Sequence, residues 1–127
     1  MPANTVSTGT VSVTPELVVR EIKLESPLSG GSQGSVMKKP LTKDDGYVII
    51  QSDVSHNNVS VTYRIYNLQG KLIKVLNGDP VTQKANWDCT DQNGTRLPNG
   101  IYIIQVEAQE GGKSATPAKP KAMTCMW

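Results

Sequence analysis

Residues 59–66, with the sequence VSVTYRIY, alternate between apolar and polar side chains without a break. A period of two puts the two sets of side chains on opposite faces of an extended strand, whereas the apolar positions of a helix recur roughly every three to four residues. The β-branched residues Val, Thr and Ile number 13, 11 and 8, about a quarter of the chain, and these residues favour strands. Because no segment shows a helical period, we expect an all-β fold.

Turn-forming residues divide the chain into about seven strand candidates. These are residues 17–25, 46–51, 59–66, 71–76, 81–87, 100–108 and 122–127. In the first of them, one face of a half-buried strand would carry Val18, Arg20, Ile22 and Leu24. A turn at residues 67–70 joins two candidates as a hairpin, with Gly70 free to take a positive φ. Short strands at this spacing predict an Ig-like antiparallel β-sandwich.

The 127-residue length suits one domain. Residues 1–16 are small and polar and are expected to form a flexible or extended N-terminal arm. The sandwich would occupy residues 17–127, with a first strand at 17–25, a long loop at 26–45 and a core at 46–127. The first strand could be exchanged onto the open sheet edge of a neighbouring molecule. We favour the simpler interpretation, in which it is the first strand of its own sheet.

Charge and hydropathy exclude several classes of partner. The formal net charge is +2, and the lysines are not interleaved with aromatic residues, so nucleic-acid binding is not expected. No apolar run approaches the length of a membrane span. The N-terminus has neither the basic nor the apolar region of a secretory signal peptide. Three explanations for the missing signal-peptide features remain open: a fragment with an added Met, export by a signal-independent route, or assembly inside the cell.

Cys89 and Cys125 are the two cysteines of the chain. They lack the C-x-x-C spacing of a metal site, and a single histidine leaves zinc without ligands. A disulfide between them would be worth at most roughly 3–4 kcal/mol by loop entropy. Two free thiols are the alternative, which we favour slightly because nothing else in the sequence indicates an oxidising compartment.

Three motifs follow one another in the second half of the chain: a hairpin at residues 61–76, the loop WDCTDQNG at residues 87–94, and LPNGIY at residues 97–102. Together they resemble the Ig-like domain of flagellar hook-capping proteins and the related C-terminal sorting domains of type IX secretion cargo. The similarity covers about residues 59–108. It departs from the family at Cys89, where glycine is usual, and in the last residues, which lack the Lys-rich ending of many sorting domains.

Each motif has a structural role that its residue types explain. The hairpin would be anchored on one core face by Ile65, Leu68, Ile73 and Leu76. Trp87 would fill the space between the sheets. The loop after it would be closed by side-chain caps from Asp88, Asp91 and Asn93, with Gly94 at positive φ. A turn through Pro98, Asn99 and Gly100 would then lead into the strand that carries Tyr102. These residues build a fold, and no chemistry follows from them.

Candidate catalytic and metal sites are weak. The Asp-rich loop does not fit a calcium-binding frame, because Cys89 occupies the first ligand position and no Glu follows. His56 is interpreted as a solvated turn histidine, and the pair Asp44 and Asp45 as solvated carboxylates. The glycines at residues 30–34 lack the Lys and helix of a phosphate loop. We therefore predict no catalytic residue, no cofactor and no metal.

The sequence predicts a non-catalytic structural or assembly module of an exported bacterial appendage or cell-surface protein. It would self-associate or bind protein partners through sheet edges and loops. One alternative is a C-terminal sorting domain of a larger secreted cargo. Another is a virion decoration or structural protein.

Overall fold

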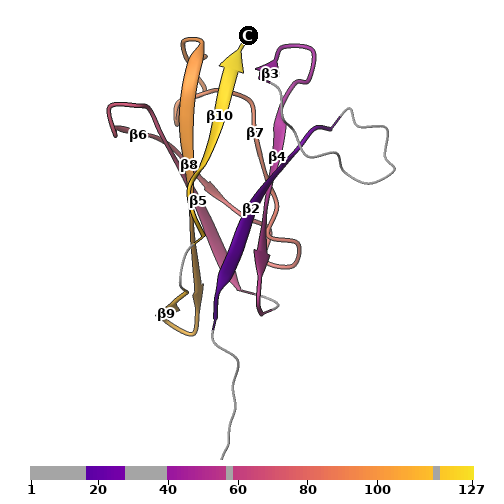
Figure 1. The fold of residues 1–127 in the computed structure, drawn as a ribbon, viewed down its shortest axis with the longest axis vertical. Helices are drawn as coiled ribbons and strands as arrows, with labels where there is room; N and C mark the ends of the chain where they lie inside the picture. The colour runs from indigo at the N-terminus through magenta and orange to yellow at the C-terminus, as the bar shows by residue number, and fades with distance from the viewer. Residues whose placement is uncertain (1–16, 28–39, 57–58, 116–117) are drawn as a thin grey trace, which may run out of the picture.

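The computed structural model describes residues 17–27, 40–56, 59–115 and 118–127, and these ranges contain nine strands and no helix (Figure 1). The strands are β2 (Val19–Glu25), β3 (Leu41–Thr42), β4 (Val48–Val54), β5 (Ser60–Tyr66), β6 (Leu72–Asn77), β7 (Ala85–Trp87), β8 (Gly100–Glu110), β9 (Lys113–Ser114) and β10 (Lys121–Met126). They form an Ig-like β-sandwich, which confirms the predicted fold class.

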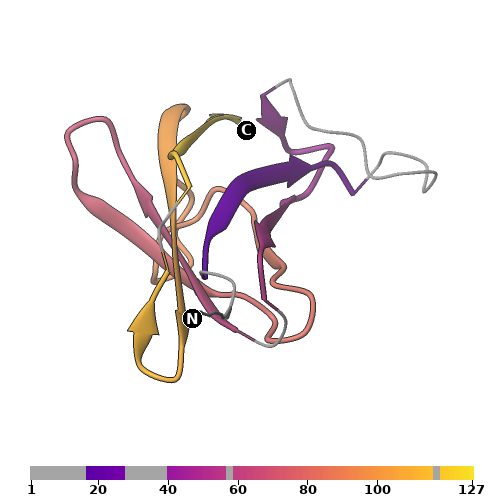
Figure 2. The ribbon, with the colours of Figure 1, turned by 60° about the horizontal axis from the view of Figure 1, so that its bottom comes forward.

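The two sheets of the sandwich differ in size. The large sheet has the order β3-β10-β8-β5-β6, with the short β9 paired to the far end of β8. The small sheet has the order β2-β4-β7. All neighbours pair antiparallel except β3 and β10, which run parallel. Figure 2 shows the two sheets as separate layers, with β2 at one edge of the small sheet.

Strict alternation in β5 and β8 creates most of the large sheet's inner face. Val61, Tyr63 and Ile65 point inward from β5, between half-exposed neighbours. In β8 the inward set is Tyr102, Ile104, Val106 and Ala108. The small sheet contributes Ile22, Leu24, Val48, Ile50 and Trp87 to the same core. The period of two that predicted these strands therefore also selects their buried faces.

The face predicted for the first strand is partly wrong. The pairing of β2 with β4 shifts register between Val19 and Glu21, so a β-bulge lies at Arg20. A bulge inserts one residue and reverses the alternation on its N-terminal side. Val19 therefore joins Ile22 and Leu24 in the core, while Arg20 is exposed and contacts Asp53 at 3.4 Å.

Two short strands lie where loops were expected. Leu41 and Thr42, within the predicted loop 26–45, form β3 beside β10, and Leu41 is fully buried. Residues 113–114, within the predicted connection before the last strand, form β9. Conversely, strand structure in the predicted segment 81–87 is confined to β7. Asp79 Oδ1 accepts hydrogen bonds from the backbone N–H groups of Val81 and Thr82, so the chain turns before β7 begins.

The N-terminal strand pairs with β4 of its own chain. The predicted arm at residues 1–16 lies outside the described residues, as does most of the loop between β2 and β3. In the described ranges, no helix has the length and apolar character needed to cross a membrane.

Candidate functional site

Two buried aromatic side chains hold the loop that connects β7 to β8. The rings of Trp87 and Tyr102 meet edge to face, with centroids 5.8 Å apart. Trp87 Nε1 donates to the carbonyl of Thr90 at 2.9 Å, and the Tyr102 hydroxyl donates to the carbonyl of Pro98 at 2.7 Å. Burial raises the pKa of the Tyr102 phenol. Each ring thus binds one end of the loop, residues 88–99, to the core.

The aspartates of this loop are engaged in turn hydrogen bonds. Asp91 Oδ1 accepts from the backbone N–H groups of Asn93 and Thr95, both at 2.9 Å. Gly94 has a φ of 83° and donates its N–H to the Asp91 carbonyl. Asp88 Oδ1 accepts from the Thr90 hydroxyl. In the described part of the chain, no group of three His, Cys, Asp or Glu side chains is arranged to hold a metal.

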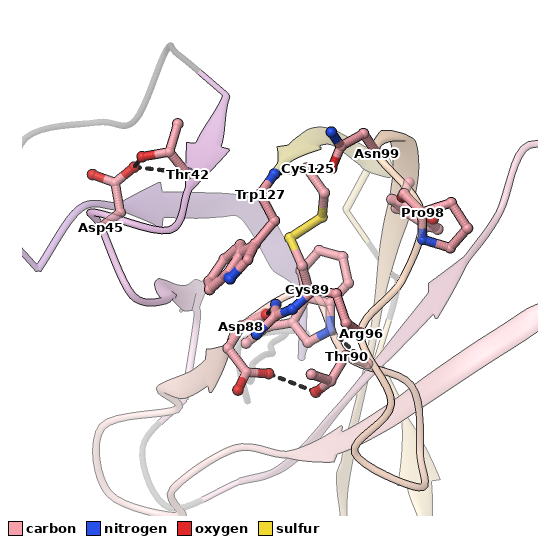
Figure 3. Close-up of a disulfide and its surroundings, with 12 residues drawn as sticks. Thr42, Asp45, Asp88, Cys89, Thr90, Arg96, Pro98, Asn99, Cys125 and Trp127 are labelled. Atoms are coloured by element: carbon pink, nitrogen blue, oxygen red, sulfur yellow. Dashed lines mark hydrogen bonds between the residues drawn. A yellow bond between two sulfur atoms is a disulfide. The ribbon is translucent and has the colours of Figure 1, made fainter.

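A disulfide joins the same loop to the C-terminal strand (Figure 3). Cys89 and Cys125 are bonded, with Cα atoms 6.1 Å apart, and both are fully buried. Cys89 has a φ of 62°, in the left-handed region that glycine adopts most easily. The backbone at this position therefore has the conformation expected for the glycine that is usual there, while the side chain provides a covalent link to β10.

The last residue packs over this loop. The Arg96 guanidinium lies 3.6 Å from the centroid of the Trp127 ring, a cation–π contact. Arg96 also donates to the carbonyl of Asp88. The backbone N–H of Trp127 donates to Asn99 Oδ1 at 2.9 Å. Figure 3 shows these residues grouped around the disulfide. No pattern in the sequence indicated this cluster.

The loop also covers the outer edge of β6. Gln92 donates its backbone N–H to the carbonyl of Ile73, and its side-chain Oε1 accepts from the backbone N–H of Val75. One residue thus bonds to two outward-facing backbone groups of β6, as a neighbouring strand would. Lys74 Nζ adds a bond to the carbonyl of Asp91. This arrangement blocks the addition of a further strand at the edge.

The hairpin at residues 61–76 differs from its expected anchoring at one position. Ile65 is fully buried, and Ile73 and Leu76 pack against the core. Leu68 is instead 66% exposed, because it lies in the turn. Gly70 has a φ of 85° in this turn. Gly100, at the start of β8, also has a positive φ.

Two side chains interpreted as solvated are engaged by the fold. Asp45 is only 4% exposed, and its Oδ2 accepts from the N–H and hydroxyl of Thr42, which closes the turn after β3. The interpretation of Asp45 as solvated was wrong. His56 Nδ1 lies 2.8 Å from Glu110 Oε1. A pocket of about 480 Å³ opens beside Tyr47, Lys74 and Asp88, but Lys74 and Asp88 both bond to the loop that borders it.

Comparisons with known proteins agree with the resemblance seen in the motifs. A family model described as the FlgD Ig-like domain matches residues 37–112, more than half of the chain. Comparison with curated proteins finds no match. Among solved structures, dimeric latent PorU from Porphyromonas gingivalis is similar over 64% of this chain and 8% of its own, with a TM-score of 0.53 and 19% identity.

A second similar structure is PorZ, a bacterial surface component of the type IX secretion system of the same organism. It is similar over 71% of this chain and 11% of its own, with a TM-score of 0.48 and 22% identity. The chain therefore spans a small fraction of both neighbours, and the likeness concerns the fold of one domain.

Proposed function

The chain belongs to the FlgD Ig-like domain family, and from this premise we propose that it is a non-catalytic structural or assembly module of an exported bacterial appendage or cell-surface protein. One observation carries the proposal. Polar groups in and beside the loop at residues 88–99 hold its backbone in place. Asp91 caps its turn, Gln92 covers the edge of β6, and the donor groups of Trp87 and Tyr102 bond to its carbonyls. This arrangement suits a rigid support better than a reaction centre.

The disulfide supports an extracellular location. Structural disulfides form and persist in oxidising compartments and are rare in the cytosol. Cys89 and Cys125 are bonded and fully buried, so the link belongs to the core of the folded domain. We infer that the domain functions after export.

Protein partners are inferred to bind through the surfaces of the sandwich, whether they are further copies of this chain or other subunits. Exchange of residues 17–25 between molecules receives less support than surface contact. The reason is that β2 already pairs with β4 over most of its length.

Localisation in cells of the source organism tests the proposal. Antibody labelling should find the chain on the cell surface or in an appendage, and alkylation in denaturant without a reducing agent should leave Cys89 and Cys125 unmodified. A cytosolic chain with reduced cysteines would contradict the proposal. Release into the medium as the end of a larger cargo would favour a sorting domain, and recovery in phage particles would favour a virion protein.

A further inference from the structure

An apolar area covers one half of the outer face of the large sheet. Cross-strand register places four of its residues in one row over β10, β8, β5 and β6. In that order they are Ala122, Ile103, Tyr66 and Leu72. The positions alternate with buried ones in β8 and β10, so the row faces solvent. We call this area the apolar patch, and it comprises Tyr66, Leu68, Leu72, Ile101, Ile103 and Ala122.

The patch is exposed and uncharged. Leu72 and Ile101 are each 45% exposed, and Leu68 is more so. A shallow pocket of about 420 Å³ lies at one side of it, lined in part by Tyr66, Leu68 and Ile103, and none of the described residues that line the pocket carries a charge. Single exposed apolar side chains are common, but a contiguous group marks an interaction site. The other half of the same face is polar, with Arg64 and Glu107 paired at 2.7 Å.

Two sheet edges are poor sites for the addition of a strand. Gln92 covers the edge of β6. On β2, exposed charged side chains at Arg20, Glu21 and Lys23 discourage edge-to-edge pairing. A partner is therefore better received on the face of the large sheet than at these edges.

The sequence before Leu17 has matching chemistry. Residues 1–16, MPANTVSTGTVSVTPE, contain one charged side chain, Glu16, and three valines at positions 6, 11 and 13. Burying this segment against an uncharged surface leaves at most one side-chain charge to be desolvated, which limits the cost.

We propose that residues 1–15 of one molecule dock on the apolar patch of the next, so that copies of this chain associate head to tail. The inference rests on the proposed assembly role and names its partner as a second copy of this chain. The two contacting surfaces differ, so the interface is heterologous and each added copy offers a free patch at the growing end.

The position of β2 favours a contact between molecules over one within a molecule. Val19 pairs with Val54, and Ser60 pairs with Gln109, so β2 starts at the end of the sandwich where β5 starts (Figure 1). Tyr66 lies at the opposite end of β5, roughly 20 Å away, and on the outside of the other sheet, at least about 10 Å further. Sixteen extended residues span about 55 Å. Most of the segment would be used to reach its own patch, whereas all of it is available to a neighbour.

Two variants of the full chain separate the contributions of the segment and the patch. The segment variant carries Val11→Asp and Val13→Asp, and the patch variant carries Leu72→Glu and Ile101→Glu. Leu68→Glu is a milder patch variant, because its turn side chain is already exposed. Val81→Glu is the matched control: Val81 is 73% exposed and lies outside the patch. Circular dichroism and melting temperature verify the fold of each variant.

Sedimentation velocity from about 1 µM to 1 mM measures the association, a range that covers weak interfaces. The wild type and Val81→Glu should grow in mass with concentration. The segment and patch variants should associate at least about tenfold more weakly, because each places a charge in an apolar contact. An equimolar mixture of the two variants should form pairs that do not grow, since only one competent segment and one competent patch remain.

Three results would overturn the inference. They are a wild type that stays monomeric, a segment variant that associates as strongly as the wild type, or a mixture of the two variants without pairs. A segment variant that still associates would show that the patch packs on another patch. None of these results affects the proposed export and surface location, which the localisation experiment tests separately.

Discussion

The hydroxyl of Tyr63 on β5 lies 2.8 Å from the hydroxyl oxygen of Ser52 on β4, so a hydrogen bond joins the two sheets inside the core. Tyr63 also donates to the carbonyl of Gln83 at 2.6 Å. Because a phenol has one proton, Ser52 is the donor to Tyr63. Gln83 has a φ of 61°, and this contact holds it beside the core.

Stability should fall in alkaline solution as Tyr63 is forced to ionise. Burial raises its pKa to about 12, an effect that the bond from Ser52 partly offsets. The unfolded chain ionises near the ordinary value of 10.0. The stability associated with the neutral phenol is therefore present below pH 10 and is lost as the pH rises toward 12. Urea unfolding should show a loss of about 2–3 kcal/mol over this interval.

Tyr63→Phe provides the control for that interval. At neutral pH it should be less stable by about 1–3 kcal/mol, because Ser52 and the Gln83 carbonyl lose a buried partner. Above pH 10 its stability should decline less steeply than that of the wild type. Equal slopes for the two proteins would mean that Tyr63 does not cause the alkaline loss.

The left-handed backbone at Cys89 predicts an unequal response to two substitutions. Removing the disulfide as Cys89→Ala with Cys125→Ser should cost about 3–4 kcal/mol. Cys89→Gly with Cys125→Ser should cost about 1 kcal/mol less, because glycine adopts a positive φ without a steric penalty. Denaturant unfolding of the matched pair measures the difference. If alanine proves as stable as glycine, the loop does not keep this conformation without the disulfide.

Gln92 should protect the amide of Val75 from solvent. Gln92→Ala removes the side-chain acceptor and should destabilise the domain by about 0.5–1.5 kcal/mol. The exchange of the Val75 amide with deuterium should accelerate by about tenfold. Gln92→Glu keeps an oxygen at the same position and should preserve most of the protection. Unchanged exchange in Gln92→Ala would show that the loop does not cover this edge in solution.

Gly78 is predicted to be required for close packing against Gln83. A Cβ at residue 78 would lie 3.1 Å from the Gln83 carbonyl oxygen and 3.4 Å from the Tyr63 ring. Gly78→Ala should therefore cost about 1–2 kcal/mol of unfolding free energy, as overpacking does. The penalty should shrink in the Tyr63→Phe background, where the Gln83 carbonyl is free to move. Additive effects in this double-mutant cycle would contradict the coupling.

The regular parts of the fold could be predicted because alternation with a period of two indicates both that a segment is a strand and which of its side chains are buried. It identifies β5 and β8 together with their buried side chains, Tyr63 and Tyr102 among them. The same rule failed at Arg20, since a bulge depends on the partner strand and leaves no pattern in the chain itself. Leu41 was missed because a strand of two residues is too short to show a period.

The loop end of the sandwich was harder to predict, because it is assembled from residues far apart in sequence. For Cys89 and Cys125 the slight preference for two free thiols was wrong, because the sequence does not show which side chains the fold brings together. Gln92 looks like any polar loop residue, and its role depends on the edge of β6. The glycine expected at position 89 was a usable signal, because it implied a positive φ that a cysteine would have to adopt.

The Cys89–Cys125 bond also determines how the domain would carry mechanical load. A pull on Trp127 passes through Met126 and reaches Cys125, where the covalent link transfers the tension directly to Cys89. The chain between the two cysteines, which includes β8 and most of β10, is bypassed and cannot be extended while the bond is intact. Tension from the C-terminal side would therefore act on the strands before residue 89. In an exposed filament, those strands would set the force at which the domain unravels.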